Sequence, residues 1–178
     1  NSENIGVIDT APLASCSAIA GDNAGGTFPI IPSGGVDNNY TFTYVNGTLT
    51  ITKAPLTAKA DDKSRSYGLA NPAFTISYTG FVNGDTDSEI TKPTAATVAT
   101  PLSNVGTYPI SLTGGSALNY NITLQTGQLT VNISPLIARA ADVARIYGQA
   151  NPTLSIVYIG FLNGDNASSI TPPTISTT

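Results

Sequence analysis

One feature limits the possible folds of this chain more than any other: the sequence repeats itself with a period of 80 residues. Residues 54–98 recur as residues 134–178, with 24 identities in 45 positions and no gap. Residues 26–54 recur as residues 106–134, with 12 identities in 29 positions. Before residue 26 the pattern continues after a one-residue gap, which places Thr10 opposite Thr91. A chain with this period is a tandem array of small domains.

Proline indicates where the domain boundaries lie. Pro55 and Pro135 each follow a strand-like run, where a proline would interrupt a β ladder. We therefore expect one complete repeat flanked by two partial repeats. The C-terminal part of one repeat spans residues 1–53, the complete repeat spans 54–133, and the N-terminal part of a further repeat spans 134–178. A break near residues 94–101 is an alternative phase, which gives two nearly complete repeats.

The strings that recur most clearly are rich in tyrosine, glycine and asparagine. We interpret them as structural signatures of the repeat, because glycine and asparagine favour turns and a tyrosine ring packs well in a small core. The signature residues are Tyr67, Gly68, Asn71, Pro72, Tyr78, Gly80, Phe81, Asn83, Gly84 and Asp85, with Tyr147, Gly148, Asn151, Pro152, Tyr158, Gly160, Phe161, Asn163, Gly164 and Asp165 one period later.

Apolar and polar residues alternate with a period of two in much of the chain, which indicates strands. Residues 56–60 and 108–112 are examples. The clearest predicted element is a hairpin in which strands over residues 40–44 and 49–51 flank an Asn46-Gly47 turn. The next repeat has a corresponding Thr126-Gly127 turn.

A short helical turn is the one helical element expected in each repeat. Asp85 is predicted to cap a turn that reaches Ile90, and Asp165 to cap the equivalent turn that reaches Ile170. The whole pattern predicts a mostly-β fold of tandem 80-residue domains, each an Ig-like sandwich or a β-grasp-like sheet with at most one short helix. A helix over residues 84–90 packed on the sheet would favour the β-grasp arrangement.

Composition excludes several classes of function. The chain has no His and one Cys, so it carries no His-based triad and no Cys-cluster metal site. Only seven residues are Lys or Arg and the net charge is −4, so we expect no basic surface that could bind nucleic acid. No apolar run is long enough to span a membrane. We therefore expect no catalytic residue, no metal, no cofactor and no enzymatic activity.

Two groups of residues are candidates for ligand sites. Asp85, Asp87 and Glu89 alternate like calcium ligands, but the second copy keeps only Asp165, so a turn is the favoured interpretation. Tyr67 and Tyr147 are candidates for stacking on sugars. We favour a ring packed over the neighbouring Asn-Pro, with its hydroxyl bonded to backbone.

The recurring strings together resemble a known family. Tyr-Gly-x-Ala-Asn-Pro is followed by Tyr-x-Gly-Phe-x-Asn-Gly-Asp, then by residues 105–108 (Val-Gly-Thr-Tyr), 118–121 (Leu-Asn-Tyr-Asn) and 127–131 (Gly-Gln-Leu-Thr-Val). From about residue 26 onward the chain resembles the MBG ("mostly beta, glycine-rich") repeats. The resemblance implies a tandem repeat of a large bacterial surface or secreted protein, including adhesin-like ones, and brings no catalytic motif.

Three functions are compatible with these observations. The leading hypothesis is a structural stalk or adhesin repeat on the bacterial cell surface, whose partners are the neighbouring repeats. The second is a module that binds carbohydrates or a host surface through avidity. The third is self-association into a filament, in which a partial repeat of one copy pairs with a partial repeat of another.

Overall fold

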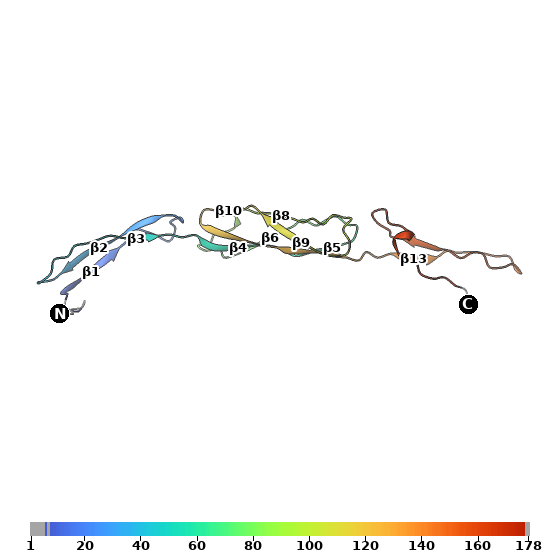
Figure 1. Cartoon of the computed structure of the whole chain (residues 1–178), viewed down its shortest axis with the longest axis horizontal. Helices are drawn as coiled ribbons and strands as arrows, with labels where there is room; N and C mark the ends of the chain where they lie inside the picture. Colours follow the sequence, from blue (N-terminus) through green and yellow to red (C-terminus); the bar gives the residue numbers. More distant parts are fainter. Residues whose placement is uncertain (1–5, 7, 177–178) are drawn as a thin grey trace. The chain divides into compact units, whose positions relative to one another are not determined.

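The computed structural model describes residue 6 and residues 8–176, and its regular structure is almost entirely β (Figure 1). No α-helix occurs in this part of the chain. The helical elements η2 (Asp87–Glu89) and η3 (Ala167–Ser169) are 3-10 turns of 3 residues each. The predicted mostly-β fold is thus confirmed. Within the same residues, no helix has the length and apolar character needed to cross a membrane.

The chain divides into two compact units, each built from several stretches of sequence. The first unit holds the described residues up to Lys59 together with Ser77–Thr94 and Thr113–Gln125. It contains a sheet of order β1-β2-β3, a sheet of order β11-β4-β6, and a short ladder between β7 and β10. The strands are β1 (Thr10–Ser15), β2 (Thr27–Val36), β3 (Gly47–Thr50), β4 (Ala54–Ala60), β6 (Ile76–Thr79), β7 (Ile90–Thr91), β10 (Ser116–Ala117) and β11 (Tyr120–Gln125).

The second unit holds Ala60–Ile76, Ala95–Leu112 and the described residues from Thr126 onward. Its larger sheet has the order β5-β12-β9-β8, and its smaller sheet pairs β13 with β14. The strands are β5 (Lys63–Ser66), β8 (Thr94–Ala96), β9 (Gly106–Thr113), β12 (Gly127–Asn132), β13 (Ile137–Ala140) and β14 (Ile156–Ile159).

The predicted hairpins are wrong. Residues 40–46 form no strand, and β3 pairs with β2 instead, with Thr27 opposite Thr50. In the complete repeat, β11 and β12 are separated by one residue but belong to different sheets. β11 runs parallel to β4, and β12 runs parallel to β5 and antiparallel to β9. Long-range partners outcompete the local turn, because each strand gains a full ladder from them.

The predicted cap of the helical turn is also wrong by one residue. Thr86 is the N-cap of η2, and its side chain and that of Glu89 form a capping box. Asn166 caps η3 in the same way. No residue of either turn is buried, so neither turn is the packed helix that would favour a β-grasp arrangement. Asp85 and Asp165 are left for a different role.

The buried side chains belong to the complete repeat. Leu56, Ile110, Leu129 and Val131 are the largest fully buried residues among those described, and each contributes roughly 1.5–3 kcal/mol of stability. Leu129 is 0 % exposed, because β12 lies between β5 and β9. Its equivalent one period earlier, Leu49, is 40 % exposed on β3, which has only β2 beside it among the described strands. In the described residues, the sheet of β1, β2 and β3 therefore covers Leu49 less completely than the sheet of β5, β12, β9 and β8 covers Leu129.

Candidate functional site

The two Asn-Gly-Asp turns have the same backbone geometry. Asn83 and Asn163 both have a φ of 56°, and the glycines that follow them have φ values of 81° and 85°. The backbone N–H of Asp85 donates to the carbonyl of Val82 at 3.0 Å, and the equivalent bond closes the second turn at 2.9 Å. Two positive φ angles in a row are tolerated by asparagine followed by glycine, so these residues permit the turn.

The first turn places the Asp85 carboxylate against a buried tyrosine. The hydroxyl of Tyr120 donates to Asp85 Oδ2 at 2.6 Å, and the backbone N–H of Val82 donates to the same hydroxyl at 3.2 Å. The Tyr120 ring is only 3 % exposed and contacts Phe81 edge to face, with 5.4 Å between the ring centroids. The hydrogen bond to Asp85 raises the pKa of Tyr120 above its ordinary value, because ionisation would break the bond and place two negative charges together.

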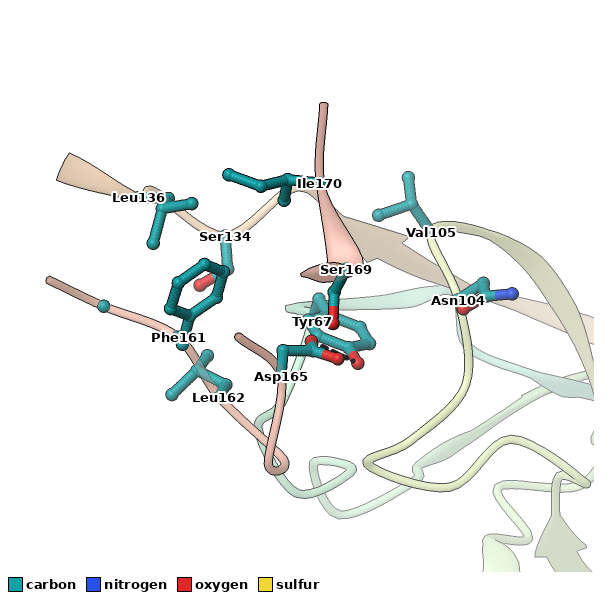
Figure 2. Close-up of a pocket in the computed structure, with 11 residues that line it drawn as sticks. Tyr67, Asn104, Val105, Ser134, Leu136, Phe161, Leu162, Asp165, Ser169 and Ile170 are labelled. Carbon is teal, nitrogen blue, oxygen red and sulfur yellow. Dashed lines mark hydrogen bonds between the residues drawn. The ribbon is translucent and has the colours of Figure 1, made fainter. Parts of the chain in front are cut away.

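The second turn uses the equivalent carboxylate for a tyrosine from a different part of the repeat. Tyr67 donates its hydroxyl to Asp165 Oδ2 at 2.9 Å, as Figure 2 shows. Tyr67 belongs to the complete repeat, whereas Asp165 lies 98 residues later, in the next one. The expectation that this hydroxyl bonds to backbone is therefore wrong, because the neighbouring turn supplies a stronger, charged acceptor.

Tyr147, one period after Tyr67, lacks this environment. Its side chain is 99 % exposed, and Gly148 beside it has a φ of 83° with open space around it. Gly68, in contrast, is packed so closely that a Cβ added to it would lie 2.6 Å from Leu162 Cδ1. Asp165 and Leu162 thus cover Tyr67 and Gly68. The equivalent pair, Tyr147 and Gly148, is exposed among the described residues.

The asparagines of the two turns make one more recurring contact. Within the first unit, Asn83 Nδ2 donates to the carbonyl of Ala20 at 3.4 Å. Within the second unit, Asn163 Nδ2 donates to the carbonyl of Pro101 at 3.0 Å. Ala20 and Pro101 correspond to each other through the one-residue gap in the repeat. Each turn therefore makes the same contact with a segment that lies 63 or 62 residues earlier in the sequence.

A cavity lies beside each turn. The cavity of the second unit has a volume of about 340 Å³ and is bordered by Tyr67, Leu136, Phe161 and Asp165, which Figure 2 shows around it. The equivalent cavity in the first unit has a volume of about 230 Å³, and Tyr120 and Asn119 take part in its wall.

The remaining signature residues hold the chain close to the turns. Tyr78 and Phe81 have ring centroids 5.8 Å apart, and the equivalent rings of Tyr158 and Phe161 are 5.6 Å apart. A Cβ at Gly80 would lie 2.6 Å from the carbonyl oxygen of Pro55, so only glycine fits there. Gly160 approaches Pro135 in the same way, at 3.0 Å. Asn151 and Pro152 are exposed.

Asn71 and Pro72 are half-buried, and Asn71 belongs to a network that the sequence did not reveal. Arg65 is 6 % exposed, and its Nε donates to Asn71 Oδ1 at 2.7 Å. Its two Nη atoms donate to the carbonyls of Ser66 and Thr100. Asn71 Nδ2 in turn donates to the carbonyl of Ala99 at 2.6 Å. The one available signal was the identity of Arg65 and Arg145 across the repeat, which is also typical of an exposed polar position.

The acidic residues near the first turn each have a separate partner. Asp85 binds Tyr120, Asp87 pairs with Lys92 at 2.6 Å, and Glu89 accepts from the backbone N–H of Thr86 at 2.8 Å. The bond from Thr86 is the largest cause of the lowered pKa of Glu89. In the described part of the chain, no group of three or more acidic, His or Cys side chains is placed to hold a metal ion.

Comparison with known proteins gives one match. A family model described as the MBG domain (YGX type) matches residues 1–50, 56–130 and 136–178. Tyr-Gly-x strings stand at residues 67–69 and 147–149. No curated protein and no solved structure matches the chain. With three consecutive matches that together cover almost all of its length, the chain belongs to the MBG domain family of the YGX type.

Proposed function

We propose that this chain is a non-enzymatic structural repeat of an extracellular bacterial surface protein, which provides reach and mechanical continuity. Its principal partners would be the neighbouring repeats, with no role in nucleic-acid binding or membrane insertion. The observation that carries the proposal is the contact that the asparagine of each Asn-Gly-Asp turn makes with a segment about 60 residues earlier, at Ala20 and at Pro101. A contact that returns with the sequence period supports an array of repeats that are all built in the same way, which a spacer needs.

The strand pairing of the complete repeat supports a load-bearing role. β4 and β5 are its first strands, and β11 and β12 are its last. β4 pairs in parallel with β11 over 6 positions, and β5 pairs in parallel with β12 over 4 positions. Force applied to the two ends of the repeat pulls these parallel runs past each other. All the ladder hydrogen bonds then resist together instead of opening one at a time.

Small-angle scattering tests the proposal. The chain is compared with longer versions that carry one or two additional copies of residues 54–133. We expect the maximum dimension to grow by a constant increment for each added repeat. A length that levels off would refute the spacer function.

The same experiment on a double variant, Asn83→Gly with Asn163→Gly, isolates the recurring contact. Glycine keeps the positive φ of the turn but removes the side-chain donor. We expect a broader distribution of distances and a smaller increment for each repeat. An unchanged increment would show that the asparagine contact does not orient the repeats.

Carbohydrate or host-surface binding through avidity is a second candidate, in which Tyr147 would stack on a sugar. An exposed ring is a suitable platform for stacking on a sugar. A glycan array with the chain and with Tyr147→Ala tests it. Binding that disappears in the variant would support this function, and no binding by a multivalent form of the chain would remove it for the glycans tested.

A further inference from the structure

Two parallel strand pairs share one register. β4 pairs with β11, from Ala54 opposite Tyr120 onward, and β5 pairs with β12, from Lys63 opposite Leu129 onward. In both ladders each residue lies opposite the residue 66 positions later in the sequence. The two strand pairs belong to different sheets, yet the chain enters the second pair in the register in which it leaves the first.

A side chain continues this register where the ladders are interrupted. Residues 60–62 and 126–128 separate the registered positions of the first ladder from those of the second. Asp62 Oδ1 accepts a hydrogen bond from the backbone N–H of Gln128 at 2.8 Å, and these two residues are also 66 positions apart. Hydrogen bonds to a carboxylate are stronger than those to a neutral acceptor. The Asp62 side chain therefore acts at a position where a ladder bond would otherwise be expected.

The two strands approach each other closely at the interruption. A Cβ added to Gly127 would lie 2.3 Å from the carbonyl oxygen of Ala60 and 3.1 Å from that of Asp61. Only glycine leaves room for such an approach of one backbone to another. The backbone N–H of Asp61 donates to the carbonyl of Thr75 at 3.0 Å, which fixes this segment. The interruption is thus a packed crossing of two strands.

Backbone hydrogen bonds lie beyond both outer ends of the paired stretches. The N–H of Ala54 donates to the carbonyl of Asn119 at 2.9 Å, and the N–H of Tyr67 donates to the carbonyl of Asn132 at 2.8 Å. Alternate side chains of β4 and β12 are buried, so one face of each of these strands is shielded from water. Hydrogen bonds from which water is excluded are harder to replace one at a time.

We propose that residues 54–66 and 120–132 form a clamp against force, in which the Asp62 carboxylate bears load between the two ladders. Tension that reaches the complete repeat along the chain enters at residue 54 and leaves at residue 132. Because the strands are parallel, this tension slides one strand along the other. Once β4 has separated from β11, the bond between Asp62 and Gln128 is the first of the second strand pair to be loaded. The inference rests on the proposed role in mechanical continuity and names a residue that controls it.

Unfolding at constant force in two pulling directions tests this role. Cys16→Ser removes the native thiol, and new cysteines at exposed positions carry the handles. Thr52→Cys with Ile133→Cys makes the strands slide, whereas Leu69→Cys with Ile133→Cys opens the second ladder from its far end. We expect the chain to unfold more slowly in the sliding direction at the same force, because many hydrogen bonds then resist together. The rate of forced unfolding reports the unfolding barrier directly.

Asp62→Ala should accelerate unfolding in the sliding direction roughly 2- to 10-fold, as expected for the loss of one hydrogen bond. In the opening direction its rate should equal that of the parent chain, because the ladder opens from Ser66 and Asn132 and reaches Asp62 last. Asp62→Asn keeps an acceptor oxygen and should restore most of the resistance. Asp142→Ala, one period later and outside the loaded segment, is the matched control and should change neither rate.

Three outcomes would overturn the inference. They are equal rates for the parent chain in both directions, an Asp62→Ala variant that unfolds like the parent in the sliding direction, and a variant that is accelerated equally in both directions. The last outcome would mean that Asp62 contributes only to general stability. Circular dichroism checks that each variant is folded, and the comparison of the two directions in the parent chain needs no variant of Asp62. The increment of length per repeat in small-angle scattering is independent of these rates, so the spacer function and the clamp can fail separately.

Discussion

Arg65→Ala should destabilise the protein far more than the same substitution one period later. Arg65 is buried and donates to three oxygens, those of Asn71, Ser66 and Thr100. Arg145 has the same position in the third repeat, but it is exposed and donates to the carbonyl of Gln149 at 3.2 Å. The chain therefore carries its own control for the effect of burial on one residue type.

The magnitude follows from the network around Arg65. Hydrogen bonds to a charged group contribute roughly 1.5–3 kcal/mol each, while removing a buried charge returns part of its desolvation cost. The oxygens left behind are neutral, so we expect a net loss of about 3 kcal/mol for Arg65→Ala. For Arg145→Ala we expect less than about 1 kcal/mol, as for other exposed positions.

Urea unfolding followed by tyrosine fluorescence measures the difference, since the chain has eight Tyr and no Trp. With a slope of about 1–3 kcal/mol per molar urea, a loss of 3 kcal/mol lowers the midpoint by roughly 1–3 M. Far-UV circular dichroism should report the same shift. Equal midpoints for Arg65→Ala and Arg145→Ala would refute the argument that the buried network stabilises the complete repeat.

Three further predictions concern single positions. Gly127→Ala should lower the free energy of unfolding in urea by about 3 kcal/mol, because the new Cβ would lie 2.3 Å from a backbone carbonyl oxygen. Its equivalent, Gly47→Ala, should cost less than about 1 kcal/mol, because the nearest atom is a side-chain carbon at 3.5 Å, and similar costs for the two variants would contradict this. The raised pKa of Tyr120 contributes stability that is present below the ordinary tyrosine pKa of about 10 and is lost as the pH rises above it, so Tyr120→Phe should flatten the alkaline fall of the melting temperature. The lowered pKa of Glu89 contributes stability that is present above the ordinary glutamate pKa of about 4.3 and is lost as the pH falls below it, so Glu89→Gln should flatten the acid fall; an unchanged acid slope would contradict it.

Some turns and strands could be predicted from the sequence, because they depend on local chemistry. The Asn-Gly pairs at 83–84 and 163–164 have the two positive φ angles that this dipeptide tolerates. The period-two pattern of residues 56–60 becomes part of β4, with Leu56, Ala58 and Ala60 buried. The boundaries at Pro55 and Pro135 remain a prediction.

The pairing of the strands could not be predicted in the same way. Residues 40–51 have every local feature of a hairpin, yet β3 pairs with β2 and residues 40–46 form no strand. β11 and β12, one residue apart, separate into two sheets because β4 and β5 offer them parallel partners far away in sequence. A local pattern specifies that a strand can form, but not which edge it joins.

The sequence by itself therefore determined that this protein is a tandem array of mostly-β repeats. The 80-residue period and the alternation of apolar and polar side chains can be read directly from the order of the residues. Only the tertiary structure decided that Asp85 and Asp165 bind tyrosines and that Arg65 is buried. These features arise from contacts between residues tens of positions apart, whose free energy exists only when the chain has brought them together.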